Sequence, residues 1–390
     1  MMPSIKRQAS DSFSSGALVK RQKSSADLND SKSLTTSSSN IRDGAIVQSV
    51  SNSHIPLTLA TCAKPMLQVS NSRLIEDGQI LRTTSLQAPI MELTGHSGEV
   101  FAVRFEKSGQ HIASGSMDRS ILLWNTYGEC ENYGKLTGHK GAVLDLHWSR
   151  DSQNIYSASA DMTVASWDVE TGSRIRKHLG HEEVINSLDV ARRGNELLLS
   201  GSDDGSIGIW DPRQKKEVDF IQTDFPITAV ALAEQGHEIY SGGIDNDIKV
   251  WDVRKMEVTY TMKGHTDTVT SLEVSPDGQT LLSNSHDSTV RTWDIRPFAP
   301  VNRAVQTYDG APAGFEKNLI KASWSAKGDR ICAGSGDRTA VVWDTRTAKL
   351  LYKLPGHKGT VNDVRFAPDG EPIIVSASTD RTLILGELGR

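Results

Sequence analysis

Serine, histidine and aspartate recur together along the chain, and these are the residue types of a serine hydrolase. In the stretch 264–294, His265 is followed by Ser283, then by Asp287 four residues later and by Trp293 after six more. In a hydrolase the serine would attack a carbonyl, the histidine would take the serine's proton, and the aspartate would orient the histidine. Such a set occurs once per active site and needs an exposed serine, with no reason for an accompanying tryptophan.

The set returns at regular intervals, which favours a structural role. Six aspartates each precede a tryptophan by six residues, and successive tryptophans stand 43, 43, 41, 42 and 50 residues apart. This spacing matches the roughly 40 to 45 residues of a WD-repeat propeller blade. A serine hydroxyl between a histidine and an indole N–H would leave no buried polar group unpaired and would fix the strand register. The complete tetrads are His96, Ser114, Asp118 and Trp124; His139, Ser157, Asp161 and Trp167; His181, Ser200, Asp204 and Trp210; and His265, Ser283, Asp287 and Trp293.

Three further copies of the repeat are incomplete. Each copy has short apolar runs separated by turn residues, as at Pro276-Asp277-Gly278, and this alternation predicts strands joined by tight turns. One such sheet cannot bury its own faces, so seven copies predict an all-β, seven-bladed WD-repeat propeller. The fourth copy has Phe225-Pro226 near the expected Gly-His, the sixth has Ala333 for serine and no Gly-His, and the seventh has His357, Ser376 and Asp380 but Gly386 for tryptophan.

The N-terminal part of the chain differs from the repeats in composition. Fifteen serines fall in the first 53 residues, and residues 1–84 carry ten Lys and Arg against six Asp and Glu. We expect residues 1–84 to be disordered and residues 85–390 to form the propeller, with residues 86–93 supplying the outer strand that closes the last blade. Lys20, Arg21 and Lys23 form a candidate nuclear-import signal, with a weak nucleic-acid contact or a solvated tail as alternatives.

The composition argues against several classes of protein. The chain has a net charge of −5, 37% hydrophobic residues, no apolar run long enough for a membrane span, and three widely separated cysteines. Phosphate-binding and zinc-protease motifs are also missing from the sequence. We therefore expect no catalytic residue, cofactor, metal, membrane contact or small-molecule substrate.

The surface should carry the function. The longest interval between tryptophans contains an excess of residues at 297–318, and an extended loop with Pro, Gly and exposed aromatics suggests partner binding, with a tolerated insertion as the alternative. Arg296, Arg303, Lys317 and Lys321 would give this loop positive charge for peripheral RNA contact, although residues 85–390 carry −9 overall. The partner-binding candidates are Phe298, Phe315 and Lys317 in the loop, and Glu99, Arg119, Glu183, Asp203, His286 and Arg338 at one rim.

Several stretches lie outside the repeat consensus, at residues 85–91, 121–125, 132–133, 242–252, 296–300, 315–319 and 351–357. These stretches resemble the family of forty-kilodalton WD-repeat subunits of the U5 small nuclear ribonucleoprotein. The resemblance covers residues 85–388, and the tail shares Val19-Lys20-Arg21-Gln22 but is otherwise longer and richer in serine. It implies a nuclear spliceosome component that docks on the large central scaffold protein of the U5 particle and supports pre-mRNA splicing without catalysis.

A second class of function is suggested by the ends of four repeats. Arg213, Arg254, Arg296 and Arg346 each complete a WDxR pattern. This pattern is associated with propellers that serve as substrate receptors of cullin-RING ubiquitin ligases. The arginines would then dock a ligase adaptor, or they would only pair with a carboxylate at a blade edge.

Overall fold

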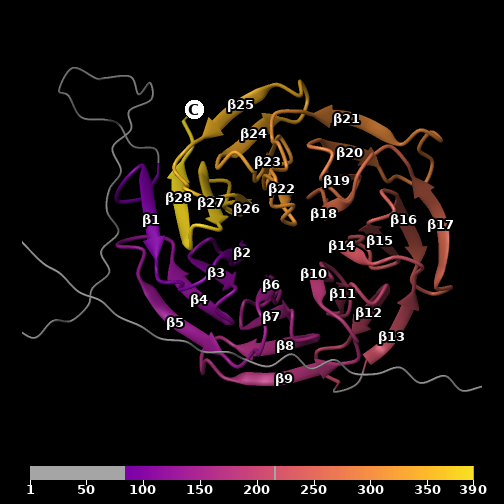
Figure 1. The fold of residues 1–390 in the computed structure, drawn as a ribbon, viewed down its shortest axis with the longest axis horizontal. Coiled ribbons are helices and arrows are strands. Elements are labelled where there is room, and N and C mark those ends of the chain that lie inside the picture. Colours follow the sequence, from indigo (N-terminus) through magenta and orange to yellow (C-terminus); the bar gives the residue numbers. More distant parts are fainter. Residues whose placement is uncertain (1–83, 215–216, 390) are drawn as a thin grey trace, which may run out of the picture. The chain divides into compact units, whose positions relative to one another are not determined.

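The computed structural model describes residues 84–214 and 217–389, which form seven four-stranded antiparallel sheets arranged as the blades of a ring (Figure 1). This confirms the predicted seven-bladed propeller. Apart from Thr84, the predicted disordered tail, including Lys20, Arg21 and Lys23, lies outside the described residues. Within the described ranges, no helix is long and apolar enough to cross a membrane.

Each blade is a meander whose first strand lies nearest the ring axis (Figure 1). Blade 1 comprises β2 (Val100–Phe105), β3 (His111–Ser116), β4 (Ser120–Asn125) and β5 (Asn132–Thr137). Blade 2 comprises β6 (Val143–Trp148), β7 (Asn154–Ser159), β8 (Thr163–Asp168) and β9 (Arg174–Leu179). Blade 3 comprises β10 (Ile185–Val190), β11 (Leu198–Ser202), β12 (Ser206–Trp210) and β13 (Glu217–Gln222). Blade 4 comprises β14 (Ile227–Leu232), β15 (Glu238–Gly243), β16 (Ile248–Asp252) and β17 (Glu257–Met262).

The remaining blades follow the same order around the ring. Blade 5 comprises β18 (Val269–Val274), β19 (Thr280–Ser285), β20 (Val290–Asp294) and β21 (Ala304–Tyr308). Blade 6 comprises β22 (Ala322–Trp324), β23 (Arg330–Ala333), β24 (Ala340–Asp344) and β25 (Leu350–Leu354). Blade 7 comprises β26 (Val361–Phe366), β27 (Ile373–Ser378), β28 (Thr382–Glu387) and, as its outer strand, β1 (Ile90–Thr94).

Blade 7 joins the two ends of the described chain. Strand β1 pairs antiparallel with β28, from Ile90 opposite Gly386 to Thr94 opposite Thr382. The outer strand of the last sheet therefore comes from the N-terminal side of the ring, and the other three come from its C-terminal side (Figure 1). This pairing satisfies backbone groups of β28 that would otherwise lie at a sheet edge.

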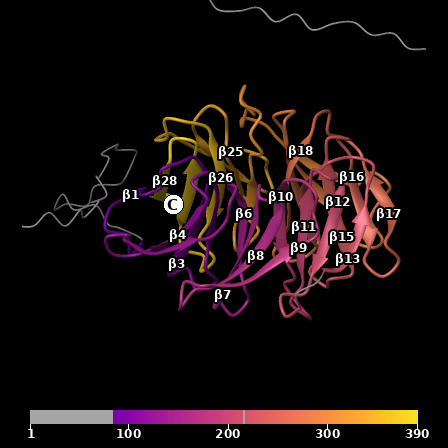
Figure 2. The ribbon, with the colours of Figure 1, turned by 60° about the horizontal axis from the view of Figure 1, so that its bottom comes forward.

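The core lies between neighbouring blades, because each sheet must bury both faces. One cluster, for example, packs Ile121 and Leu123 of blade 1 against Val143, Trp148 and Trp167 of blade 2. The connections between strands lie at the two ends of the blades (Figure 2). We call "upper face" the end with the loops between blades and the turns between second and third strands, and "lower face" the opposite end.

The prediction of a single extended loop at residues 297–318 is wrong. Strand β21 occupies residues Ala304–Tyr308 in its middle and pairs with β20. Phe298 therefore lies on the lower face before β21, whereas Phe315 and Lys317 lie on the upper face after it. The sequence pattern concealed this strand because four of its five residues are exposed, as on the outer edge of a blade.

Candidate partner-binding surface and the buried tetrads

The four complete tetrads share one geometry. Each tryptophan Nε1–H donates to the serine Oγ at 2.7–2.9 Å, and each serine Oγ lies 2.7 Å from the histidine Nε2. Each histidine Nδ1 lies 2.9–3.0 Å from the aspartate Oδ2. Protons can be assigned along this series in one consistent way: Nδ1–H donates to the carboxylate, and Nε2 accepts from the serine hydroxyl.

The aspartate of each tetrad joins two upper-face connections. In blade 5, Asp287 Oδ2 also accepts from the backbone N–H of Thr266 at 3.1 Å, and its Oδ1 accepts from the N–H of Thr289 at 2.9 Å. Burial raises the pKa of Asp287, but hydrogen bonds from His265 and Thr289 outweigh burial and hold this pKa well below its usual range. The carboxylate therefore fixes the loop before the blade to the turn between its second and third strands.

This arrangement leaves no accessible nucleophile in the four tetrads. Ser114, Ser157, Ser200 and Ser283 each have 0% of their surface exposed. The oxygen of each serine already accepts the indole N–H of its tryptophan. No tetrad residue lines the groove between blades 1 and 2 or the cavity at the ring axis. The residue types of a hydrolase are present, but a substrate carbonyl has no path to the hydroxyl.

The incomplete copies use other partners for the same groups. In blade 4, Trp251 donates to Ser241 at 2.8 Å, and Lys249 Nζ replaces the missing histidine as partner of Asp245 at 2.6 Å. In blade 6, where Ala333 replaces serine, the Trp343 indole donates to the Asp309 backbone oxygen at 2.9 Å. In blade 7, which lacks the tryptophan, His357 Nδ1 and Nε2 still contact Asp380 at 2.9 Å and Ser376 at 2.8 Å.

The prediction that Lys321 adds charge to a surface loop is wrong. Lys321 is only 6% exposed and lies where the first strands surround the ring axis, with its Nζ 2.5 Å from Asp145 Oδ1. This pair links blade 6 to blade 2. Burial raises the pKa of Asp145, but the surrounding positive groups, Lys321 first among them, together outweigh burial and hold this pKa well below its usual range.

Further charges surround this pair and complete an axial ion network that the sequence reasoning missed. Arg365 of blade 7 pairs with Glu273 of blade 5, and Arg104 of blade 1 lies 3.8 Å from the same carboxylate. Arg104 Nη2 also lies 2.8 Å from His147 Nε2. These residues line the second cavity, so ionic contacts between blades that are not neighbours fill the axis. The signal in the sequence was the presence of charges within apolar first strands, as in Val143–Trp148 and Val361–Phe366.

The rim candidates lie together on the upper face but in different environments. Arg119, Glu183 and Arg338 are exposed. Asp203 is half-buried and accepts from Asn186 Nδ2 at 2.7 Å, and His286 Nε2 lies 3.1 Å from the Asn318 backbone oxygen. Glu99 is half-buried, so three of these six side chains are freely presented to a partner.

The WDxR arginines lie on the lower face, at the turns that follow the third strands. The backbone N–H of each arginine donates to the carboxylate of the preceding Asp at 2.8–3.0 Å. The Arg296 side chain also pairs with Asp294, its nearest contact being 2.5 Å. The WDxR pattern thus supports a turn in this chain, and in Arg296 the guanidinium is engaged within its own motif.

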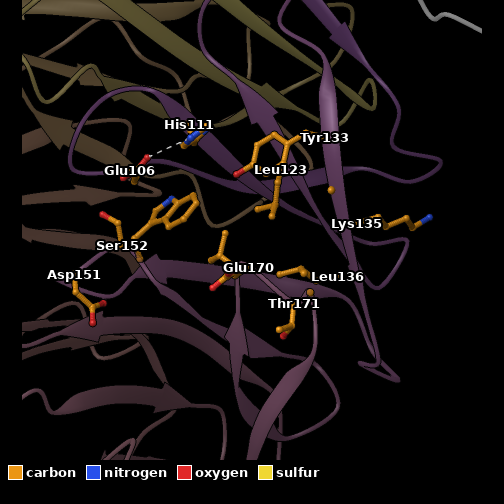
Figure 3. A pocket seen from close by; sticks show the side chains of 14 residues that line it. Glu106, His111, Leu123, Tyr133, Lys135, Leu136, Asp151, Ser152, Glu170 and Thr171 are labelled. Carbon is orange, nitrogen blue, oxygen red and sulfur yellow. Dashed lines mark ion pairs between the residues drawn. The ribbon is translucent and has the colours of Figure 1, made fainter.

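The largest cavity described here is an open groove of about 620 Å³ between blades 1 and 2 (Figure 3). Leu123, Leu136 and Trp148 form its apolar base. At its rim, the His111 and Tyr133 rings lie 5.1 Å apart, and His111 Nε2 is 4.0 Å from Glu106 Oε2. The described residues contain no group of three His, Cys, Asp or Glu side chains that could hold a metal ion.

The fold and the repeats define the class of the protein as a WD-repeat propeller with a structural tetrad in most blades. The family described as "WD domain, G-beta repeat" matches seven segments, at residues 87–125, 130–168, 172–211, 217–252, 256–294, 305–344 and 348–385. The U5 small nuclear ribonucleoprotein 40 kDa protein of Homo sapiens is 55% identical over 307 residues, covering 79% of this chain and 86% of that protein.

Two more distant relatives agree with this similarity. The Dictyostelium discoideum protein of the same name is 50% identical over 308 residues, 79% of this chain and 86% of that protein. The pre-mRNA-splicing factor cwf17 of Schizosaccharomyces pombe is 48% identical over 323 residues, 83% of this chain and 94% of that protein. The chain therefore belongs to the family of the U5 small nuclear ribonucleoprotein 40 kDa protein, which confirms the resemblance found in the sequence.

Proposed function

We propose that this protein is a non-catalytic subunit of the U5 particle that supports pre-mRNA splicing in the nucleus by docking on the large central scaffold protein. The observation that carries the proposal is the 55% identity across the propeller to a U5 subunit. The buried tetrads support the non-catalytic part of the proposal, because their serines cannot meet a substrate. Lys20, Arg21 and Lys23 remain the candidate import signal.

The lower-face loop before β21 is the surface that we assign to the protein scaffold. Phe298 and Val301 are 100% and 105% exposed, although large apolar side chains are usually covered. Arg303 Nη1 holds the loop by donating to the backbone oxygens of Asp294 and Arg296, both at 3.0 Å. A partner would therefore meet an apolar knob that loses little conformational entropy on binding.

The alternative function, a substrate receptor of a cullin-RING ligase, has no support from the relatives or from the structure. The Arg296 guanidinium pairs with Asp294 of its own motif, which is the carboxylate pairing expected of an arginine at a blade edge.

Depletion and add-back in nuclear extract tests the splicing role. Extract depleted of the endogenous protein should regain splicing of a reporter pre-mRNA when the recombinant full chain is added. Phe298→Ala/Val301→Ala should weaken docking by about 30-fold or more, the effect of losing a 2 kcal/mol hot spot, and should restore splicing poorly. The matched control is Leu350→Ala/Leu351→Ala, which removes two partly exposed apolar side chains from β25. Failure of the wild-type chain to restore splicing would contradict the proposed function.

A further inference from the structure

The charges of the upper face are divided between two halves of the ring. In blades 6, 7, 1 and 2, the upper-face loops and turns carry six exposed cations, which we call the basic arc: Lys317, Arg338, Lys358, Arg381, Arg119 and Lys140. In blades 3 to 5 the same connections carry Glu182, Glu183, Asp224, Asp247 and Asp267. The cation there, Lys263, pairs with Asp247 at 3.2 Å.

Three arginines of the basic arc occupy equivalent turn positions in neighbouring blades. Arg119, Arg338 and Arg381 directly follow the turn aspartate and have φ angles of 67°, 71° and 73°. This left-handed backbone favours Gly or Asn, and blades 3 and 4 indeed have Gly205 and Asn246 at this position. The same position holds Met162 in blade 2 and Ser288 in blade 5, so the turn does not require arginine and these three side chains are available for another role.

The cations of the arc are available to a ligand. Among the described residues, five of the six form no ion pair, and Lys317 has only a long contact of 3.9 Å to Asp267. Asp118, Asp161 and Asp380 in these connections are bound to tetrad histidines. Asp337 pairs with Lys353. Asp337 is exposed despite this pairing, and the other carboxylates of the same connections that reach solvent are Glu99, Asp309 and Glu316.

An exposed aromatic side chain lies at one end of the arc. Phe315 is 107% exposed, on a loop fixed to the turn that carries Arg338. The fixing contacts are a hydrogen bond from the Gly336 N–H to the Pro312 oxygen at 2.7 Å and close packing of Gly314 on Gly336. A flat apolar ring beside a row of cations is the combination that binds single-stranded nucleic acid, through base stacking and phosphate contacts.

We propose that the basic arc binds single-stranded RNA, with phosphates on the six cations and one unstacked base on Phe315. This inference deepens the proposed function and rests on it, because the partner is RNA of the splicing machinery. An acidic peptide would use the cations but has no base to stack on the ring. A duplex would contact the cations but keeps its bases stacked on one another.

Fluorescence anisotropy of the full chain with a labelled 16-nucleotide oligouridylate tests this proposal. If all six cations contact phosphate, log affinity against log salt should have a slope of about −4, or about 300-fold weaker binding at 200 than at 50 mM KCl. Arg119→Asn/Arg338→Asn/Arg381→Asn should reduce the slope to about −2. Asparagine suits the left-handed turns, so this variant should fold. Phe315→Ala should weaken binding about 5-fold or more without changing the slope.

The control removes the same charge from the other face. Arg213→Ala/Arg254→Ala/Arg346→Ala should leave the slope and the affinity close to wild type. No binding at 50 mM KCl, an equal loss in both triple variants, or preference for a polyglutamate peptide would each overturn the proposal. The Arg119→Asn/Arg338→Asn/Arg381→Asn variant also separates RNA binding from the proposed function. If the scaffold protein still co-purifies with this variant from nuclear extract, the proposed function is supported whatever the oligonucleotide experiment shows.

Discussion

Replacing Ser283 by alanine should destabilise the ring by removing one atom that serves two buried partners. The Trp293 indole N–H donates to Ser283 Oγ at 2.8 Å, and His265 Nε2 lies 2.7 Å from the same oxygen. Leaving a buried donor or acceptor without a partner costs about 1–3 kcal/mol, so two of them should cost about 2–6 kcal/mol. Solvent cannot compensate, because both rings are buried.

Two other serines make this prediction quantitative. Ser241 in blade 4 accepts from the Trp251 indole, but no tetrad histidine is present there, so Ser241→Ala should cost about half as much as Ser283→Ala. Ser187 is buried, and its Oγ has no hydrogen-bond partner among the described residues. Ser187→Ala should therefore lie within about 0.5 kcal/mol of wild type.

Urea unfolding followed by tryptophan fluorescence measures the three variants. The expected order of midpoints is Ser187→Ala, then Ser241→Ala, then Ser283→Ala at the lowest urea concentration, with similar slopes. Equal midpoints for Ser187→Ala and Ser283→Ala would refute the structural account of the tetrad. Loss of splicing add-back by Ser283→Ala with an unchanged midpoint would instead restore the catalytic interpretation.

Three further perturbations test other parts of the structure. Lys321→Met leaves the buried Asp145 carboxylate without its partner charge and should lower the free energy of unfolding by about 3–5 kcal/mol. Adding Asp145→Asn should recover part of this loss, and additive effects of the two substitutions would contradict an interaction between the two side chains. Burial, followed by the Arg176 charge, lowers the pKa of His178 to about 4. In the unfolded chain the pKa of His178 is higher, near 6.5, so the unfolded state takes up a proton first as the pH falls. The free energy of unfolding should therefore be unaffected by His178 above pH 6.5 and fall by about 3 kcal/mol between pH 6.5 and pH 4. Urea titrations at different pH values measure this dependence, and His178→Phe should flatten it. Deleting residues 86–93 removes four of the five residues of β1 and should cause unfolding or aggregation, which light scattering and a thermal melt measure. An unchanged melting midpoint would argue against ring closure by β1.

The repeat architecture could be predicted because it depends on local signals that recur. A tryptophan at a fixed distance from an aspartate marks the third strand in six blades, and the spacing of His357, Ser376 and Asp380 marks the seventh, so the recurring pattern predicted the number of sheets and their order. The tetrad side chains are near one another for the same reason, since their offsets equal the lengths of two strands and a turn.

What the sequence could not show depends on contacts across the ring. Lys321 and Asp145 are 176 residues apart, and their pairing follows from the circular arrangement of first strands rather than from a local motif. Strand β21 was missed because an outer strand is exposed and has no apolar alternation. The division of charge on the upper face was hidden similarly, because its residues are neighbours only after the blades close into a ring.

Affinity purification of the tagged full chain from nuclear extract, at about 0.1 and then about 0.5 M salt, tests the central claim most directly. Apolar docking on the scaffold should survive high salt, whereas contacts made only through phosphate should be lost. We predict that mass spectrometry will find the large U5 scaffold protein and U5 RNA at both salt concentrations, with much less of both retained by Phe298→Ala/Val301→Ala. Recovery of a ubiquitin-ligase adaptor without U5 proteins would contradict this account.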